Sequence, residues 1–170
     1  MKRKIAVITG TRADYGIYYS VLKAIENHKD LELSLIVCGM HLSPEFGMTI
    51  EEIQKDGFKI DDKIDTILSS DSGSAMAKSI GITLMGLTQS LERINPDILL
   101  ILGDRGEMIA GALAAVHMNI PVAHIHGGEV TGTVDESIRH SITKLSHIHF
   151  PANEDSKRRI IKMGEEEKNV

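Results

Sequence analysis

Charged side chains follow two short apolar runs in the second half of the sequence. Residues Ile98–Leu102 are followed by the polar turn 103–105, and residues 121–125 are followed by the turn 126–129. A continuous apolar run that breaks into a turn is typical of a buried parallel strand, and ligands bind at the carboxyl ends of such strands. We therefore expect acidic, basic and imidazole groups to lie together along one edge of a sheet, as they do in an active site.

Four side chains in and after these turns could transfer protons. They are Asp104, His126, Glu129 and Asp135. Carboxylates and imidazoles are the usual general acids and bases of enzymes. Asp104 and Asp135 could instead cap the helices that follow them. Glu129 follows two glycines, and a capping role is harder to assign to it. Glu136 and Arg139 could likewise form an exposed ion pair within one helix.

A third turn lies near the N-terminus. The β-rich run 5–9 is closed by Gly10, Thr11 and Arg12, and Asp14 then precedes an amphipathic helical pattern as a plausible N-cap. Backbone N–H groups at such a strand-to-helix turn can bind phosphate, and an arginine adds a bidentate donor. The turn lacks a G-x-G-x-x-G pattern, so an ordinary turn with a surface arginine explains it equally well.

Strands and helices alternate along the sequence. Further strands are predicted at residues 31–38, 58–64 and 147–150, and helices after Asp14 and at residues 48–56, 74–94, 109–118, 134–146 and 153–163. Alternation without a hairpin signal predicts an α/β domain with a doubly wound, parallel, Rossmann-like sheet. We assign this domain to residues 1–164, followed by a charged tail at residues 165–170.

Several side chains can be assigned to the core or to solvent. One face of the first helix and one face of the 74–94 helix should be buried, with Ile17, Val21, Leu22, Ile25, Met76, Ile80, Leu84, Leu87 and Leu91. Gly81 and Gly86 each cost a helix about 1 kcal/mol relative to alanine, and they indicate close packing against this domain, a second subunit or a further domain. Cys38 is expected in the core, and His41, in a loop, is expected to be solvated.

Composition excludes several classes of function. A net charge of -5 and a pI near 5.9 do not indicate a nucleic-acid or membrane-surface binder. No apolar run reaches the roughly 18 residues of a membrane span, and a single cysteine fits a reducing compartment, so we expect a cytoplasmic protein. The histidine pairs 124/126 and 147/149 lack carboxylates or cysteines at zinc-site spacing. We therefore predict neither a metal nor a cofactor.

Four ordered motifs now carry a resemblance to a known family. They are G-T-R-A-D-Y-G from Gly10, L-G-D-R from Leu102, H-I-H-G-G-E from His124 and D-E-S-I-R-H-S-I-T-K from Asp135. Together they resemble the N-terminal half of the hydrolysing UDP-N-acetylglucosamine 2-epimerases of sialic-acid synthesis, over essentially the whole chain. Related non-hydrolysing epimerases have Pro-Glu where this chain has Ala13 and Asp14, which favours the hydrolysing branch.

The resemblance implies half of a two-domain fold of the glycosyltransferase-B type, with the substrate between the domains and a homo-oligomer in the full-length enzyme. It also implies conversion of UDP-N-acetylglucosamine, or a related UDP-2-acetamido sugar, and water to the free 2-epimer and UDP. The steps would be removal of the C2 proton, anti expulsion of UDP and hydration of the 2-acetamidoglucal. The candidates for the proton steps are Asp104, His126, Glu129 and Asp135. The candidates for contacts with the sugar nucleotide are Gly10, Thr11, Arg12, Asp14, Arg105, Glu136 and Arg139.

Two features depart from the family pattern. His126 stands where the family usually has glutamate, which could make an imidazole the base, move that role to Glu129, or mark a different sugar such as N,N′-diacetylbacillosamine. The sequence also stops at Val170, where the family continues into a second domain, so we expect the 170 residues alone to be inactive. A non-catalytic sugar-nucleotide-binding domain and the N-terminal domain of a glycosyltransferase are the alternative functions.

Overall fold

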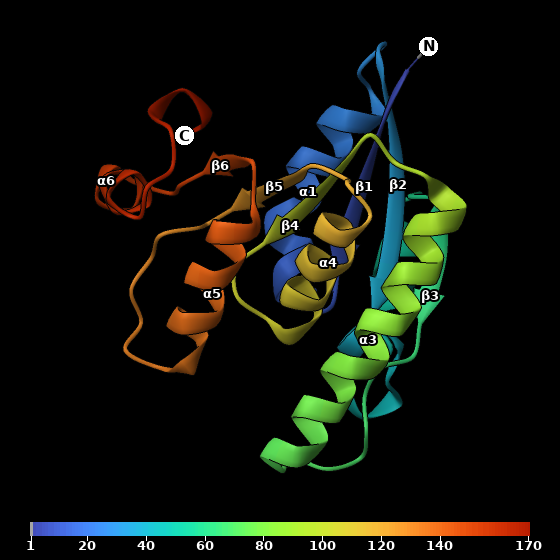
Figure 1. The fold of residues 1–170 in the computed structure, drawn as a ribbon. Helices are drawn as coiled ribbons and strands as arrows, with labels where there is room; N and C mark the ends of the chain where they lie inside the picture. The colour runs from blue at the N-terminus through green and yellow to red at the C-terminus, as the bar shows by residue number, and fades with distance from the viewer. Residues whose placement is uncertain (1) are drawn as a thin grey trace.

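The computed structural model describes residues 2–170, which contain one parallel sheet of six strands (Figure 1). The strands are β1 (Arg3–Thr9), β2 (Leu31–Cys38), β3 (Ile60–Ile64), β4 (Ile98–Leu102), β5 (Val122–Ile125) and β6 (Ile148–Phe150). All neighbouring strands in this sheet pair in parallel, in the order β3-β2-β1-β4-β5-β6. The predicted doubly wound parallel α/β fold is therefore confirmed.

The direction of winding reverses between β1 and β4. Strands β1 to β3 proceed outward on one side, and strands β4 to β6 proceed outward on the other. β1 and β4 are hydrogen-bonded neighbours, with Ile5 opposite Ile98 and Val7 opposite Leu100. In open α/β sheets, ligands bind outside the carboxyl ends of the strands at such a reversal. The turns that follow Thr9 and Leu102 lie at this point.

Helices cover both faces of the sheet (Figure 1). They are α1 (Arg12–Glu26), α2 (Ile50–Lys55), α3 (Gly73–Ile94), α4 (Gly106–His117), α5 (Val134–Leu145) and α6 (Glu154–Lys162). Short 3-10 helices are η1 (Gly39–Leu42), η2 (Pro44–Phe46) and η3 (Glu167–Asn169). Helices α3, α4 and α5 lie on one face, whereas α1 and α2 contribute to the core on the other.

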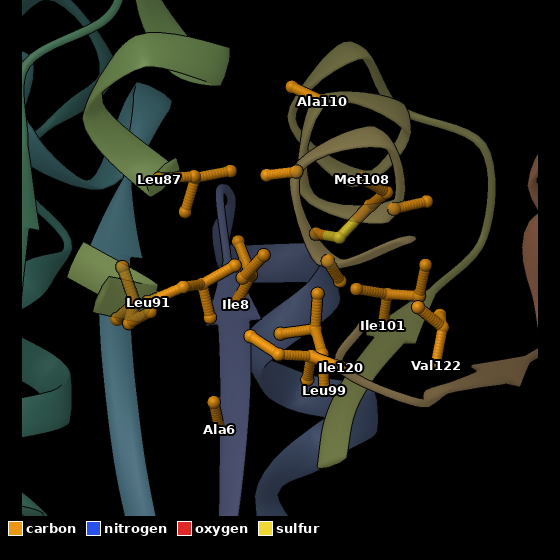
Figure 2. Close-up of a cluster of buried hydrophobic side chains, with 14 of the residues drawn as sticks. Ala6, Ile8, Leu87, Leu91, Leu99, Ile101, Met108, Ala110, Ile120 and Val122 are labelled. Carbon is orange, nitrogen blue, oxygen red and sulfur yellow. The ribbon is translucent and has the colours of Figure 1, made fainter. Parts of the chain in front are cut away.

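The larger core lies between the sheet and helices α3, α4 and α5. Figure 2 shows Leu87 and Leu91 of α3 directed toward Ile8 of β1, with Met108 of α4 beside them. Gly111 lies where a Cβ would come within 2.5 Å of the Ile8 Cδ1 methyl, so α4 packs closely on the sheet at this glycine. This contact holds the middle of α4 close against β1.

Four helices begin with a side-chain cap. The capping residues are Thr11 for α1, Ser72 for α3, Thr133 for α5 and Asn153 for α6. The interpretation of Asp14 as the N-cap of the first helix is therefore wrong, because Asp14 is the N3 partner of Thr11 in a reciprocal capping box.

Two residues assigned to the core are exposed instead. Met76 and Ile17 are 61% and 48% exposed, so the expectation that Met76 of α3 and Ile17 of α1 are buried is wrong. Both helices keep one fully buried stripe, which includes Leu22 in α1 and Leu87 in α3. Periodicity located this stripe but not its width, because the sheet covers only part of each helix. Cys38 is fully buried, as expected.

The two glycines of α3 have different surroundings, which gives a matched stability test. A Cβ at Gly86 would lie 2.4 Å from Cγ2 of Ile64, whereas a Cβ at Gly81 would meet nothing within 4 Å. We expect Gly81→Ala to raise the free energy of unfolding by up to about 1 kcal/mol through helix propensity. Gly86→Ala should lower it, because overpacking costs about 1–3 kcal/mol. Urea unfolding of the two variants measures both effects, and equal shifts would contradict this packing.

Candidate active site

Polar turns follow the carboxyl ends of three adjacent strands, β1, β4 and β5. Arg12 lies after β1, Asp104 after β4, and both His126 and Glu129 after β5. Because these strands are parallel neighbours, their carboxyl ends share one edge of the sheet. The structure thus brings the predicted turns together at the reversal of winding, as expected for a ligand-binding edge.

The Asp104 carboxylate is held by Arg139 of helix α5. Its Oδ2 accepts a hydrogen bond from Nη2 of Arg139, whose side chain is 8% exposed. A buried charge is costly unless it is paired, so the ion pair fixes the Asp104 carboxylate at the edge of the sheet. The Nε and Nη1 atoms of Arg139 are buried and have no hydrogen-bond partner among residues 2–170. Unused buried donors are expected where a further acceptor binds.

The ordinary structural explanations for these residues are wrong. Arg105, not Asp104, occupies the N-cap position of α4, and no side chain there makes a capping hydrogen bond. Thr133 caps α5, so Asp135 does not. Glu136 and Arg139 do not form an exposed pair, because Arg139 turns inward to Asp104.

Glu136 and Asp135 occupy the first turn of α5 but differ in their contacts. Oε2 of Glu136 accepts hydrogen bonds from the backbone N–H groups of Gly132 at 2.8 Å and Thr131 at 2.9 Å. These two bonds lower the pKa of Glu136. Asp135 is exposed and accepts only from the Thr133 hydroxyl, at 3.1 Å. Glu136 therefore holds the turn, whereas Asp135 can still receive a ligand.

His126 and Glu129 lie close enough to act as a pair. The distance from Nδ1 of His126 to Oε1 of Glu129 is 3.7 Å, and both side chains are about one-third exposed, at 37% and 31%. His126 has a positive φ of 61° and donates its backbone N–H to the carbonyl of Phe150 at 3.0 Å. A left-handed conformation in a residue other than glycine is uncommon and often occurs at functional sites.

The two glycines between them allow the turn to pack against its surroundings. A Cβ at Gly127 would lie 2.9 Å from Nδ1 of His124, and one at Gly128 would lie 2.6 Å from the carbonyl of Ser156. Gly128 also has a φ of +76°, and its carbonyl accepts from Arg159 of α6. Any larger residue would displace the turn that carries His126 and Glu129.

The turn after β1 is organised by Asp14. Its carboxylate accepts from the backbone N–H groups of Thr11 at 3.1 Å and Gly10 at 3.3 Å. Burial raises the pKa of Asp14 above its usual value. These two N–H groups are thus used within the chain, so a phosphate-binding role for Gly10, Thr11 and Asp14 stays a prediction. Arg12 is largely exposed and its Nε donates to Glu52 of α2 at 3.0 Å.

Two residues near this edge were not among the candidates for the site. His41 is fully buried between the hydroxyls of Thr9 at 2.9 Å and Thr49 at 2.7 Å, so the expectation that it is solvated is wrong. Burial lowers its pKa to about 4. Glu107, the last residue of the G-D-R-G-E segment, forms an ion pair with Arg105. The only feature of the sequence that could have indicated this ion pair is the spacing of two residues between Arg105 and Glu107. Nothing in the sequence links His41 to Thr9.

Within residues 2–170, no group of three or more histidine, cysteine, aspartate or glutamate side chains could hold a metal ion. Over the same residues, no helix is both long enough and apolar enough to cross a membrane.

Comparison with known proteins places this geometry in context. Residues 23–170 match the family described as UDP-N-acetylglucosamine 2-epimerase. The UDP-N,N′-diacetylbacillosamine 2-epimerase (hydrolyzing) of Legionella pneumophila is 53% identical over 170 residues, which are 100% of this chain and 45% of the relative. The GDP/UDP-N,N′-diacetylbacillosamine 2-epimerase (hydrolyzing) of Campylobacter jejuni is 45% identical, over 99% of this chain and 44% of the relative.

The fold also matches solved structures. UDP-GlcNAc 2-epimerase from Neisseria meningitidis, solved bound to UDP-GlcNAc, aligns with a TM-score of 0.87 over 98% of this chain and 44% of its own, at 24% identity. The chain therefore spans somewhat less than half the length of the proteins that it resembles, and its fold corresponds to half of a glycosyltransferase-B-like structure.

Proposed function

Because the chain belongs to the UDP-N-acetylglucosamine 2-epimerase family, we propose that it forms the N-terminal half of a hydrolysing epimerase of UDP-2-acetamido sugars. The complete enzyme would convert the sugar nucleotide and water into the free 2-epimer and UDP. We call this chain, together with the second half that its relatives carry, the full-length enzyme. A homo-oligomer of the full-length enzyme stays a prediction.

The observation that carries the proposal is the Asp104–Arg139 pair at the reversal of winding. A carboxylate held by a buried guanidinium with two unused donors resembles a prepared reaction centre more than a surface ion pair. An aspartate that merely capped α4 would need no such partner. The identity to hydrolysing 2-epimerases over the whole chain supports the same reading.

The first chemical step is an elimination. A base removes the proton from C2, the C2–H electron pair forms the C1=C2 double bond, and the C1–O bond to UDP breaks on the opposite face. A proton at C2 beside an ether carbon is barely acidic, so the base must be positioned as UDP departs. Asp104, Asp135 and the His126–Glu129 pair are the candidates for this base.

The second step is a hydration. Water adds its hydroxyl to C1 of the 2-acetamidoglucal, and C2 receives a proton on the face opposite to the one that was lost. The product is the free 2-epimer, and atoms balance because one water is consumed and one UDP is released. This step needs a second acid or base on the other side of the ring, for which Asp135 is a candidate because it is exposed.

Arginines stabilise the departing diphosphate in this scheme. Charge that develops on a leaving group is best stabilised by donors fixed in advance, and guanidinium groups match phosphate oxygens bidentately. Arg12 and Arg105 follow β1 and β4, the two strands at the reversal of winding. Arg139 adds the two donors that Asp104 leaves unused.

The test is release of UDP by the full-length enzyme, with and without an acceptor sugar. We expect release from UDP-N-acetylglucosamine or UDP-N,N′-diacetylbacillosamine without any acceptor. The second sugar is included because two similar proteins are described as diacetylbacillosamine 2-epimerases. Release only with an acceptor would mean a glycosyltransferase, and binding without release would mean a non-catalytic domain.

Replacing His126 by glutamate tests whether the imidazole is the base. A carboxylic acid loses its proton at a lower pH than an imidazolium. A base must be deprotonated, so activity falls as the pH drops below the pKa of the base. If the imidazole is the base, we expect His126→Glu to remain active and to move the acid limb of the kcat/KM profile downward. An unchanged profile would instead favour Glu129 or Asp135, with Glu129→Gln as the companion variant.

A further inference from the structure

Glu107 reaches across the ends of three strands. It lies in the first turn of α4, directly after β4, and its side chain is only 11% exposed. A Cβ at Gly10, after β1, would lie 3.2 Å from its Cδ and Oε1 atoms. A Cβ at Gly39, after β2, would lie 2.6 Å from its Oε1 atom. The carboxylate therefore occupies the space that side chains at Gly10 and Gly39 would otherwise fill.

This carboxylate contacts the side of the Arg105 guanidinium. Its Oε1 accepts a hydrogen bond from Nη2 at 3.4 Å, and its Oε2 lies 3.3 Å from Nε as an ion-pair contact without hydrogen-bond geometry. Both contacts are on the same side of the planar group, which leaves Nη1 directed elsewhere. The Arg105 side chain is about one-third exposed, at 34%, although its Nε atom is buried.

A second carboxylate completes the surroundings of Arg105. Burial alone would lower the pKa of Arg105, but the negative charges of Glu107 and Asp14 raise it above its ordinary value. The Asp14 carboxylate is held in the α1 capping box, so it is not free to orient Arg105. Glu107 is the carboxylate that contacts the guanidinium directly, and so it sets the orientation.

We propose that Glu107 is a positioning residue, which holds the Arg105 guanidinium at the carboxyl edge so that it meets the leaving diphosphate. The proposal rests on the proposed function, in which Arg105 contacts that diphosphate. Gly10 and Gly39 contribute to this positioning, because a side chain at either glycine would crowd the Glu107 carboxylate.

The physical basis is the flexibility of arginine. A free arginine side chain samples many rotamers, and ordering it costs conformational entropy. A displacement of about 1 Å in a catalytic group can lower the rate by about 100-fold. Releasing Arg105 should therefore lower kcat more than it raises KM, because the diphosphate gains a further negative charge as the C1–O bond breaks.

A double-mutant cycle on kcat tests the proposal in the full-length enzyme. We expect Glu107→Gln to lower kcat for UDP release by about 10- to 100-fold. In an Arg105→Ala background, the same substitution should have an effect of less than about threefold, because a residue that acts through Arg105 has nothing left to position. Equal effects in both backgrounds, or no effect in either, would overturn the proposal.

Glu154→Gln is the matched control, because it removes a negative charge from the first turn of another helix, α6. Its kcat should be unchanged. If Glu107→Gln does not fold, Gly10→Ala replaces it in the cycle, since the added methyl presses on Glu107 and Gly10 has no positive φ. Effects of Gly10→Ala and Arg105→Ala that simply add would overturn the proposal. Absence of UDP release in the unsubstituted enzyme would contradict the proposed function itself.

Discussion

Asparagine in place of Asp104 is expected to lower the turnover of the full-length enzyme by at least ~100-fold, the usual scale of a general acid or base. The fold should survive at reduced stability, because the asparagine Oδ1 can still accept the hydrogen bond from Arg139 but no longer balances the charge of the buried guanidinium. What is lost is the capacity to take or give a proton at the edge of the sheet. The measurement is kcat for UDP release, together with the midpoint of thermal unfolding.

Asp97→Asn provides the control for that comparison. Asp97 comes directly before β4, whereas Asp104 follows the same strand. Oδ2 of Asp97 accepts a hydrogen bond from the backbone N–H of Lys4 at 2.7 Å, at the opposite edge of the sheet. We expect this variant to keep its turnover. Normal turnover in Asp104→Asn as well would mean that Asp104 serves only to pair with Arg139.

The 170 residues alone should bind UDP with a Kd in the millimolar range or weaker, at least ~100-fold more weakly than the full-length enzyme. Arg12 is 73% exposed at its side chain and already pairs with Glu52. Exposed ion pairs contribute only about 0–1 kcal/mol each, whereas a millimolar Kd corresponds to about 4 kcal/mol. The uridine would also lack the contacts that the second domain is expected to supply.

Calorimetric titration of UDP into the 170-residue chain measures this affinity directly. The chain should give a cooperative urea transition in the same preparation, which shows that the weak binding comes from a folded protein. Micromolar binding, or release of UDP from the sugar nucleotide, would mean that these residues hold a complete site and that a second half is not needed.

The strands were the most predictable part of the fold. Leu31–Cys38 and Ile98–Leu102 coincide with the predicted runs, because a strand buried on both faces is largely apolar and each of these two ends at a glycine. The starts of α1 and α5 were harder to predict, since threonine and aspartate both occur near each of them. In α1 the two share a reciprocal capping box, so either could have been taken for the cap.

The candidate site was predictable in place but not in its contacts. Residues that follow strand ends were assigned to one edge from the alternation of strands and helices. The partner of Asp104 could not be predicted, because Arg139 is 35 residues away and local spacing pairs it with Glu136. His41 and Glu107 were missed for the same reason, since both are defined by contacts with β1 or its turn that only the folded chain creates.

The most direct test of the proposed epimerase is the hydrogen at C2 of the product. The full-length enzyme is incubated with the UDP-2-acetamido sugar in D2O, and the free sugar is examined by NMR. Elimination and hydration remove the original C2 proton and add one from solvent on the other face. The account predicts a free 2-epimer that carries deuterium at C2, with one UDP released per sugar. A product that retains its C2 proton and its original configuration would show simple hydrolysis, and would contradict the account.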